Sequence, residues 1–196
     1  MKFPNQQIAL NMQGFGGNSV LFLVDGERIA GETLDNIDYS RLTLSNVERV
    51  EIVKGAASSL YGSSAVGGVV NLITSEFNKP LTLNLNSRYG SNNSWRNGMT
   101  LGINRGIYNG VTSFQHTASD EITLKNPGDY NKIYGFRTYS INHKMKIDPC
   151  DRLTLTARLG TFFRQRDVSS VNSERYRDFN AGVKSEYRLS ENSQLE

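Results

Sequence analysis

The stretch that decides the fold is VERVEIVKGAASSLYGSSAVGGVVNLIT, residues 47–74. Residues 49–54 alternate apolar and charged side chains, which predicts a half-buried β-strand. A glycine ends this strand, and the Ala/Ser-rich residues after it favour a single helical turn. Gly67 and Gly68 then open a second, apolar strand over residues 69–73. The stretch therefore predicts two strands joined by a short connection rich in small residues.

Another buried strand is predicted upstream. The run Val20–Val24 is entirely apolar, and Asp25 and Gly26 after it favour a tight turn. The polar residues 29–40 are predicted to form a surface loop. Ser45 begins the pattern of a capping box, which predicts a helical turn just before the strand at residues 49–54.

In order and spacing, these pieces resemble the plug domain of TonB-dependent outer-membrane receptors. Two glycine-containing segments and three strand-like segments carry the resemblance: residues 13–14, 20–28, 48–55, 60–62 and 65–74. The resemblance implies a plug domain over residues 1–78, with the first part of the plug missing from this chain.

After residue 78 the pattern changes to long segments that alternate apolar and polar side chains. In the first of these, Leu81, Leu83 and Leu85 share one face, while Thr82 and Asn84 share the other. Further segments repeat this alternation up to residue 189, and the turns between them are alternately short and long. We predict about six strands of roughly 10–13 residues each, long enough to cross a bilayer when tilted.

The predicted fold class is an α+β plug domain followed by antiparallel β-strands of an incomplete outer-membrane β-barrel, residues 79–196. The polar faces of these strands carry Arg88, Lys144 and Arg158, which favours a wet or plugged lumen. Receptor barrels with a plugged lumen have about 22 strands, so about six strands cannot close one. Residues near Met1 also lack the apolar core of a signal peptide. We therefore expect this chain to be a piece of a longer protein.

Aromatic residues collect near the predicted strand ends. Two interpretations remain open for them: residues of a membrane-interface girdle, or ordinary sheet aromatics. The residues concerned are Tyr89, Tyr134, Phe136, Phe163 and Tyr187.

Composition argues against several other classes of protein. The net charge is +3, but the basic residues are spread along the strands without a cluster, which disfavours nucleic-acid binding. Cys150 is the only cysteine, so no internal disulfide exists, and we predict that it lies in a turn over residues 148–151. His116 and His143 are the only histidines and form no cluster, so neither a metal site nor a bound cofactor is predicted, and a haem-ligand role for either is the weaker interpretation. No Ser, His and Asp grouping has a suggestive spacing, so we predict that the chain is not an enzyme.

The resemblance implies a function: active uptake of a scarce nutrient across the bacterial outer membrane, with the plug gating the barrel. The implied partners are TonB, which engages an N-terminal box absent here, outer-membrane lipid, and a nutrient such as a ferric siderophore, haem or cobalamin. The alternative is a soluble or surface β-protein that binds glycans or proteins without transport.

The resemblance also implies site residues. Apical plug loops of the family face the ligand, which indicates Phe15, Asn18, Glu32, Asp35 and Asn36. A second set is expected to contact the barrel wall: Arg49, Glu51 and Lys54. Lysine stands at residue 54, where the family usually has a basic residue facing carboxylates of the wall. The departure from arginine to lysine at this position removes the bidentate geometry of a guanidinium.

Overall fold

The computed structural model describes residues 12, 19–28, 32–33, 36–37, 46–54, 65–123, 132–167, 172–190 and 193–195. The chain divides into two compact units, Met1–Ser75 and Glu76–Glu196, and the domain boundary proposed after residue 78 lies slightly further along. Over the ranges just given, the extended elements are β-strands, and Ser19, Asn46 and Ala65 have 3₁₀-helical backbone. A search of the same ranges finds no helix long and apolar enough to cross a membrane.

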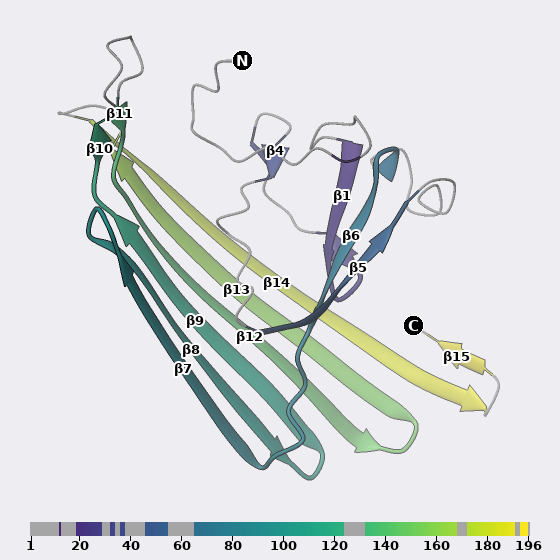
Figure 1. The fold of residues 1–196 in the computed structure, drawn as a ribbon. Helices are drawn as coiled ribbons and strands as arrows, with labels where there is room; N and C mark the ends of the chain where they lie inside the picture. Colours follow the sequence, from purple (N-terminus) through teal and green to yellow (C-terminus); the bar gives the residue numbers. More distant parts are fainter. Residues whose placement is uncertain are drawn as a thin grey trace. The chain divides into compact units, whose positions relative to one another are not determined.

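The first unit is built on a four-stranded sheet, which Figure 1 shows. Its strands are β1 (Val20–Val24), β2 (Glu27–Arg28), β5 (Val47–Val53) and β6 (Gly68–Thr74), in the order β2-β1-β6-β5. β1 pairs with β6 in parallel, whereas β2 and β5 pair antiparallel with their neighbours. The two strands predicted within residues 47–74 are therefore confirmed, and they are adjacent in the sheet.

β1 and β6 are buried on both faces, which explains their almost uninterrupted apolar sequences. One face packs Val20, Phe22, Val70 and Leu72 together, and the other packs Leu21, Leu23, Ala65 and Val69. Full burial of one such side chain contributes about 1.5–3 kcal/mol, so this parallel pair is the core of the first unit.

β5 departs from its prediction as a half-buried strand. The side chains of Val50 and Ile52 are 49% and 55% exposed. The reason is position: β5 lies at the edge of the sheet, with a neighbouring strand on one side only. The helical turn predicted from Ser45 lies mostly outside the described residues: Asn46 has 3₁₀-helical backbone, and β5 begins directly after it at Val47. The helical turn predicted after Gly55 lies outside the described residues.

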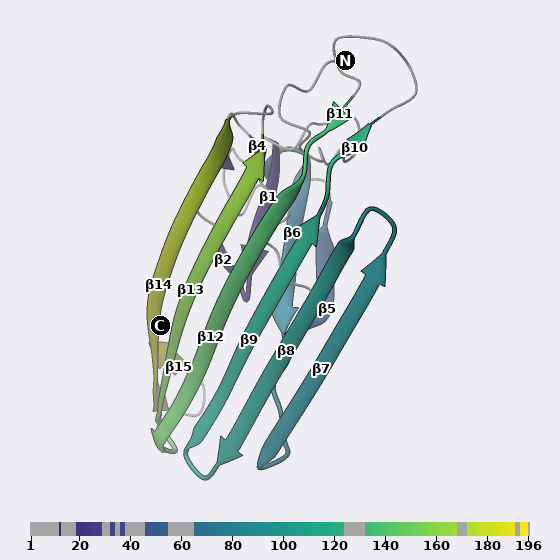
Figure 2. The same ribbon diagram turned by 90° about the vertical axis from the view of Figure 1, so that its left-hand side faces the viewer.

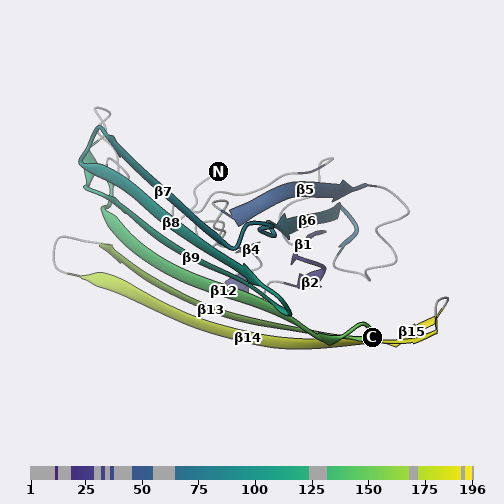
Figure 3. The same ribbon diagram turned by 90° about the horizontal axis from the view of Figure 1, so that it is seen from below.

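The second unit is an antiparallel meander, shown in Figure 2. Its strands pair in chain order: β7 (Leu81–Gly90), β8 (Ser94–Arg105), β9 (Tyr108–Ser119), β12 (Phe136–Cys150), β13 (Leu153–Asp167), β14 (Ser173–Ser190) and β15 (Ser193–Leu195). Figure 3 shows that the long strands bend along their length. The prediction of about six long strands is confirmed, with β15 as a short further strand. β7, β8 and β9 have 10–12 residues, whereas β12, β13 and β14, with 15–18, are longer than predicted.

Two shorter ribbons occur, the first of them within residues 29–40, which were predicted to form a surface loop. β3 (Glu32–Thr33) pairs with β4 (Asn36–Ile37), and β10 (Ile122–Thr123) pairs with β11 (Lys132–Ile133). Strands of two residues leave no detectable alternation in the sequence, so periodicity does not reveal them.

The register of the second sheet separates its side chains onto two faces. One row across the strands reads Leu85, Met99, Phe114, Ile141, Thr161 and Phe179, and defines what we term the apolar face. The adjacent row reads Asn84, Thr100, Ser113, Asn142, Gly160 and Asn180, and defines the polar face. Large apolar side chains stand in solvent on the apolar face, with Leu85 70%, Phe179 72% and Val183 80% exposed. The predicted alternation is thus confirmed.

The connections at the two ends of this sheet differ in length. At one end the strands are joined by two-residue connections at 106–107, 151–152 and 191–192, and at the other by 91–93, 120–135 and 168–172. We term the second end the long-loop end. The turn predicted at residues 148–151 is wrong, because β12 continues to Cys150. A register shift between Ile147 and Cys150 accommodates Pro149, since a bulge tolerates a residue without an N–H.

Candidate functional site

The predicted ligand residues lie mostly beyond what the structure describes. Phe15, Asn18 and Asp35 fall outside the described residues. The backbone of Glu32 pairs with Ile37, and that of Asn36 pairs with Thr33, so both predicted residues lie on one small ribbon. Their role in ligand binding stays a prediction.

The predicted wall-contact residues lie on β5 and directly after it. Arg49 Nε donates to Glu51 Oε1 at 2.9 Å, and an Arg49 nitrogen lies 3.8 Å from Glu48 Oε1. These side chains are about half exposed, and such exposed pairs contribute roughly 0–1 kcal/mol. Lys54 is exposed just past the end of β5, and its pairing with the wall stays a prediction.

A polar chain links β5 to the turn after β1. Asn71 on β6 accepts a hydrogen bond from the Gly26 backbone N–H at 2.9 Å, and its amide donates to Glu51 Oε2 at 3.4 Å. Glu51 also accepts from Arg49. The sequence carries a signal for this link, because Asn71 is the one polar residue within the apolar run 69–73, but its partners were not predicted.

The turn after β1 is fixed by a second contact, which was not predicted from the sequence. Asp25 and Gly26 have positive φ angles of 50° and 84°, which suits a tight antiparallel turn between β1 and β2. The Asp25 carboxylate accepts hydrogen bonds from Thr74 at the end of β6, from its backbone N–H and from its hydroxyl. The family-like segments 20–28 and 65–74 are therefore joined physically.

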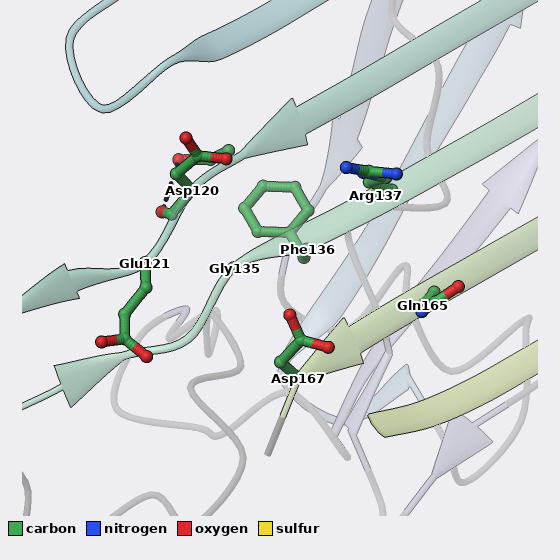
Figure 4. A pocket seen from close by; sticks show the side chains of 8 residues that line it. Asp120, Glu121, Gly135, Phe136, Arg137, Gln165 and Asp167 are labelled. Atoms are coloured by element: carbon green, nitrogen blue, oxygen red, sulfur yellow. Dashed lines mark hydrogen bonds between the residues drawn. The ribbon is translucent and has the colours of Figure 1, made fainter. Parts of the chain in front are cut away.

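The second unit has a hollow of ≈ 280 Å³ at its long-loop end, where β9, β12 and β13 end or begin. Figure 4 shows the lining side chains, with carboxylates of Asp120 and Asp167 and the guanidinium of Arg137 among them. The full lining set is Ser119, Asp120, Glu121, Gly135, Phe136, Arg137, Gln165 and Asp167. Backbone bonds from Asp120 N to Asn92 O and from Asp167 N to Gly135 O tie the neighbouring connections together. The hollow therefore offers negatively charged carboxylates as hydrogen-bond acceptors and a positively charged guanidinium as a donor.

An ion pair lies near the hollow, and the described residues were also compared with the requirements of a metal site. Lys132 Nζ lies 2.7 Å from Glu121 Oε1, and the hydrogen bond and negative charge of Glu121 raise the pKa of Lys132. Among the described residues, no group of three or more His, Cys, Asp or Glu side chains is arranged to hold a metal ion.

Aromatic rings on the apolar face form contacts near the long-loop end. His116 stacks on Tyr139 with ring centroids 4.7 Å apart, Tyr139 lies 6.2 Å from Phe163, and Arg177 lies 5.7 Å from the Phe163 ring centroid. Tyr89 and Trp95 form a second pair at 4.6 Å.

The positions of the predicted girdle residues and of the histidines can now be stated. Tyr89, Phe163 and Tyr187 lie on the apolar face, whereas Phe136 lies on the polar face and Tyr134 precedes β12. His143, also on the apolar face, has its Nδ1 atom 2.8 Å from the Thr112 hydroxyl.

The family model and the sequence relatives match the first unit, and the solved structures match both units. The family described as "TonB-dependent Receptor Plug Domain" matches residues 2–69. The Vitamin B12 transporter BtuB of Vibrio cholerae serotype O1 is 45% identical over 69 residues, which are 35% of this chain and 11% of that protein. The Vitamin B12 transporter BtuB of Photobacterium profundum is 38% identical over the same length and the same shares. The match thus spans about a ninth of these relatives.

Solved structures extend the likeness to the strands. The FrpB iron transporter of Neisseria meningitidis matches with a TM-score of 0.70 and 20% identity, over 92% of this chain and 31% of that one. The ferric enterobactin receptor PfeA of Pseudomonas aeruginosa matches with a TM-score of 0.70 and 18% identity, over 89% and 32%. At these identities the likeness concerns the fold. Residues 2–69 thus match the family of TonB-dependent receptor plug domains, and the antiparallel strands that follow share the fold of the corresponding strands in these solved structures.

Proposed function

We propose that this chain belongs to a receptor that binds a scarce nutrient outside the cell and imports it across the bacterial outer membrane, with energy delivered through TonB. The observation that carries the proposal is the succession of a plug sheet and a wall whose apolar face is exposed along its length. A soluble protein covers such a face with a second layer, whereas in a barrel wall the face meets lipid.

The two faces of the wall support this placement. Exposed Leu85, Phe179 and Val183 suit hydrocarbon, while the polar face with Lys144 and Arg158 suits a lumen that holds a plug. An unpaired strand edge is not tolerated in hydrocarbon, so we propose that β7 and β15 pair with further strands in the bilayer. Because external loops of such barrels are longer than periplasmic turns, we propose that the long-loop end faces outward.

The nutrient we propose to test first is cobalamin, because the relatives matched over the plug are vitamin B12 transporters at 38–45% identity. Iron chelates and haem remain within the proposal, since plug motifs are shared across ligand classes. The ligand would contact the loops around Phe15, Asn18, Glu32, Asp35 and Asn36. Not being an enzyme is part of the same proposal, because the family and the relatives that match are receptors and transporters.

We further propose that Arg49, Glu51 and Lys54 contact the barrel wall. Their exposure and their position on or beside an edge strand support this. Charge reversal by Lys54→Glu is expected to lower uptake, while Lys54→Arg is expected to preserve it. Equal uptake by both variants would show that Lys54 does not contact the wall.

The function is tested with the full-length receptor in a strain deleted for its own cobalamin, siderophore and haem receptors. Growth is expected on one of the three nutrients, and only while TonB is present. Growth on none of them, or growth that persists after deletion of TonB, would contradict the proposal.

A further inference from the structure

The segment that follows the plug is fastened to the wall by a compact contact at Phe77. The backbone carbonyl oxygen of Phe77 accepts hydrogen bonds from the side-chain amides of Asn104 at 2.9 Å and Asn109 at 3.1 Å. A carbonyl oxygen has two lone pairs, so both acceptor sites of Phe77 are used. Asn104 also donates its backbone N–H to the Pro80 carbonyl at 3.2 Å.

The Phe77 ring occupies the place of a missing side chain on β8. Gly102 is buried, and a Cβ atom built on it would lie 2.7 Å from Cγ and 3.0 Å from Cβ of Phe77. Carbon atoms do not approach so closely, so any residue larger than glycine would displace the ring. Phe77, Gly102, Asn104 and Asn109 together form what we term the Phe77 anchor.

The chain just before the anchor is also fastened, within the first unit. The Ser75 backbone N–H donates to the Asn46 carbonyl at 2.7 Å, and Thr74 is bound by Asp25. Only Glu76 separates Ser75 from Phe77. Ser75 is thus hydrogen-bonded within the first unit and Phe77 within the second, and Glu76 is the residue between them.

We propose that the Phe77 anchor is a mechanical stop: it ends any TonB-driven rearrangement of the plug at Glu76, so that β8 and β9 of the wall stay undisturbed. This inference rests on the proposed function for the pulling force, but not for the anchor itself. Three hydrogen bonds and a seated ring must be released together, so local opening of the segment is cooperative. A free connector would instead pass strain on to the first hairpins of the wall.

The anchor is tested first by amide hydrogen exchange in the purified full-length receptor, without any transport. In Gly102→Ala, and in the double variant Asn104→Ala/Asn109→Ala, the backbone amide of residue 104, which donates to the Pro80 carbonyl, is expected to exchange at least about tenfold faster than in wild type. Asn84→Ala is the matched control, because Asn84 is an exposed asparagine on the polar face of the adjacent strand β7. Exchange within about twofold of wild type in both anchor variants would overturn the proposal.

A second experiment tests the stop in cells. With Asn78→Cys in a Cys150→Ser background, maleimide labelling of residue 78 is expected to be independent of TonB in the wild-type anchor and to increase with TonB in Gly102→Ala. If TonB increases labelling in the wild-type anchor as well as in Gly102→Ala, the proposed stop is contradicted. Nutrient uptake is measured alongside: absence of uptake with unaltered Phe77 contradicts the proposed function and leaves the exchange result on the anchor standing.

Discussion

The carboxylate of Asp25 accepts two hydrogen bonds from Thr74, one from its backbone N–H at 2.8 Å and one from its hydroxyl at 2.7 Å. The two residues stand 49 positions apart in the chain. Asp25 also donates its own backbone N–H to the Leu72 carbonyl at 2.9 Å. The turn after β1 therefore fixes the end of β6, beyond the last paired residue of the parallel ladder.

Loss of the Asp25 carboxylate is expected to loosen the end of β6. Asp25→Ala removes both acceptors and places alanine at a positive φ angle, which together cost about 2–4 kcal/mol. Asp25→Asn, which tolerates that angle, and Thr74→Val, which loses only the hydroxyl, should each cost less. Amide exchange of residues 70–75 in the full-length receptor measures these differences. Exchange at the wild-type rate in all three variants would show that the contact contributes no stability.

Gly68→Ala is expected to be among the most destabilising changes in the plug sheet. Gly68 has a φ angle of 132°, and a Cβ atom there would lie 2.8 Å from the Val53 carbonyl oxygen. Backbone strain and overpacking each cost roughly 1–3 kcal/mol. Gly106→Asn is the control, since φ is 57° there and space is open. Thermal unfolding of the receptor, monitored by proteolysis of the plug, should detect a loss of stability for Gly68→Ala and little change for the control.

Adjacent residues on β14 separate the two faces of the wall experimentally. Phe179 and Asn180 are both exposed and lie on the apolar and the polar face. Phe179→Lys places a charge in hydrocarbon, at a cost of about 2–4 kcal/mol near the bilayer centre, and should reduce assembly of the receptor in membranes. Asn180→Lys should assemble normally. Heat-modifiable migration of outer-membrane fractions measures assembly, and equal behaviour of the two variants would contradict the assignment of faces.

The ribbon of β10 and β11 is expected to loosen slightly at high pH. Because Glu121 raises the pKa of Lys132, the stabilisation from this pair is fully present below the lysine pKa of the unfolded chain, about 10.4. It is lost as the pH rises through the higher pKa of the folded state. A spin label at Thr123→Cys, in a Cys150→Ser background, should therefore gain mobility only above about pH 10.4. In Glu121→Gln the label should already be mobile at neutral pH, and a pH response identical to wild type would exclude the pair as the cause.

Alternation made the wall predictable, because strands that separate two environments must repeat with a period of two. Leu81, Leu83 and Leu85 fall on one face, as expected. Pro149 misled the prediction: a proline beside acidic residues favours a turn, yet β12 absorbs it in a bulge before the chain reverses at 151–152. For the candidate site, Arg49 and Glu51 were named from the resemblance. Their connection through Asn71 to Gly26 was not foreseen, because it depends on which strands are adjacent.

The sequence by itself determined the succession of a plug and an alternating wall, since residue patterns of period two and small-residue motifs are local properties of the chain. Only the tertiary structure decided that β1 and β6 are parallel neighbours, that Val50 and Ile52 stand exposed at an edge, and that Asp25 meets Thr74. It also decided that Phe77 seats on Gly102. These relationships join residues far apart in the chain, and a hydrogen bond or a packing contact depends on distances that the linear order of residues does not specify.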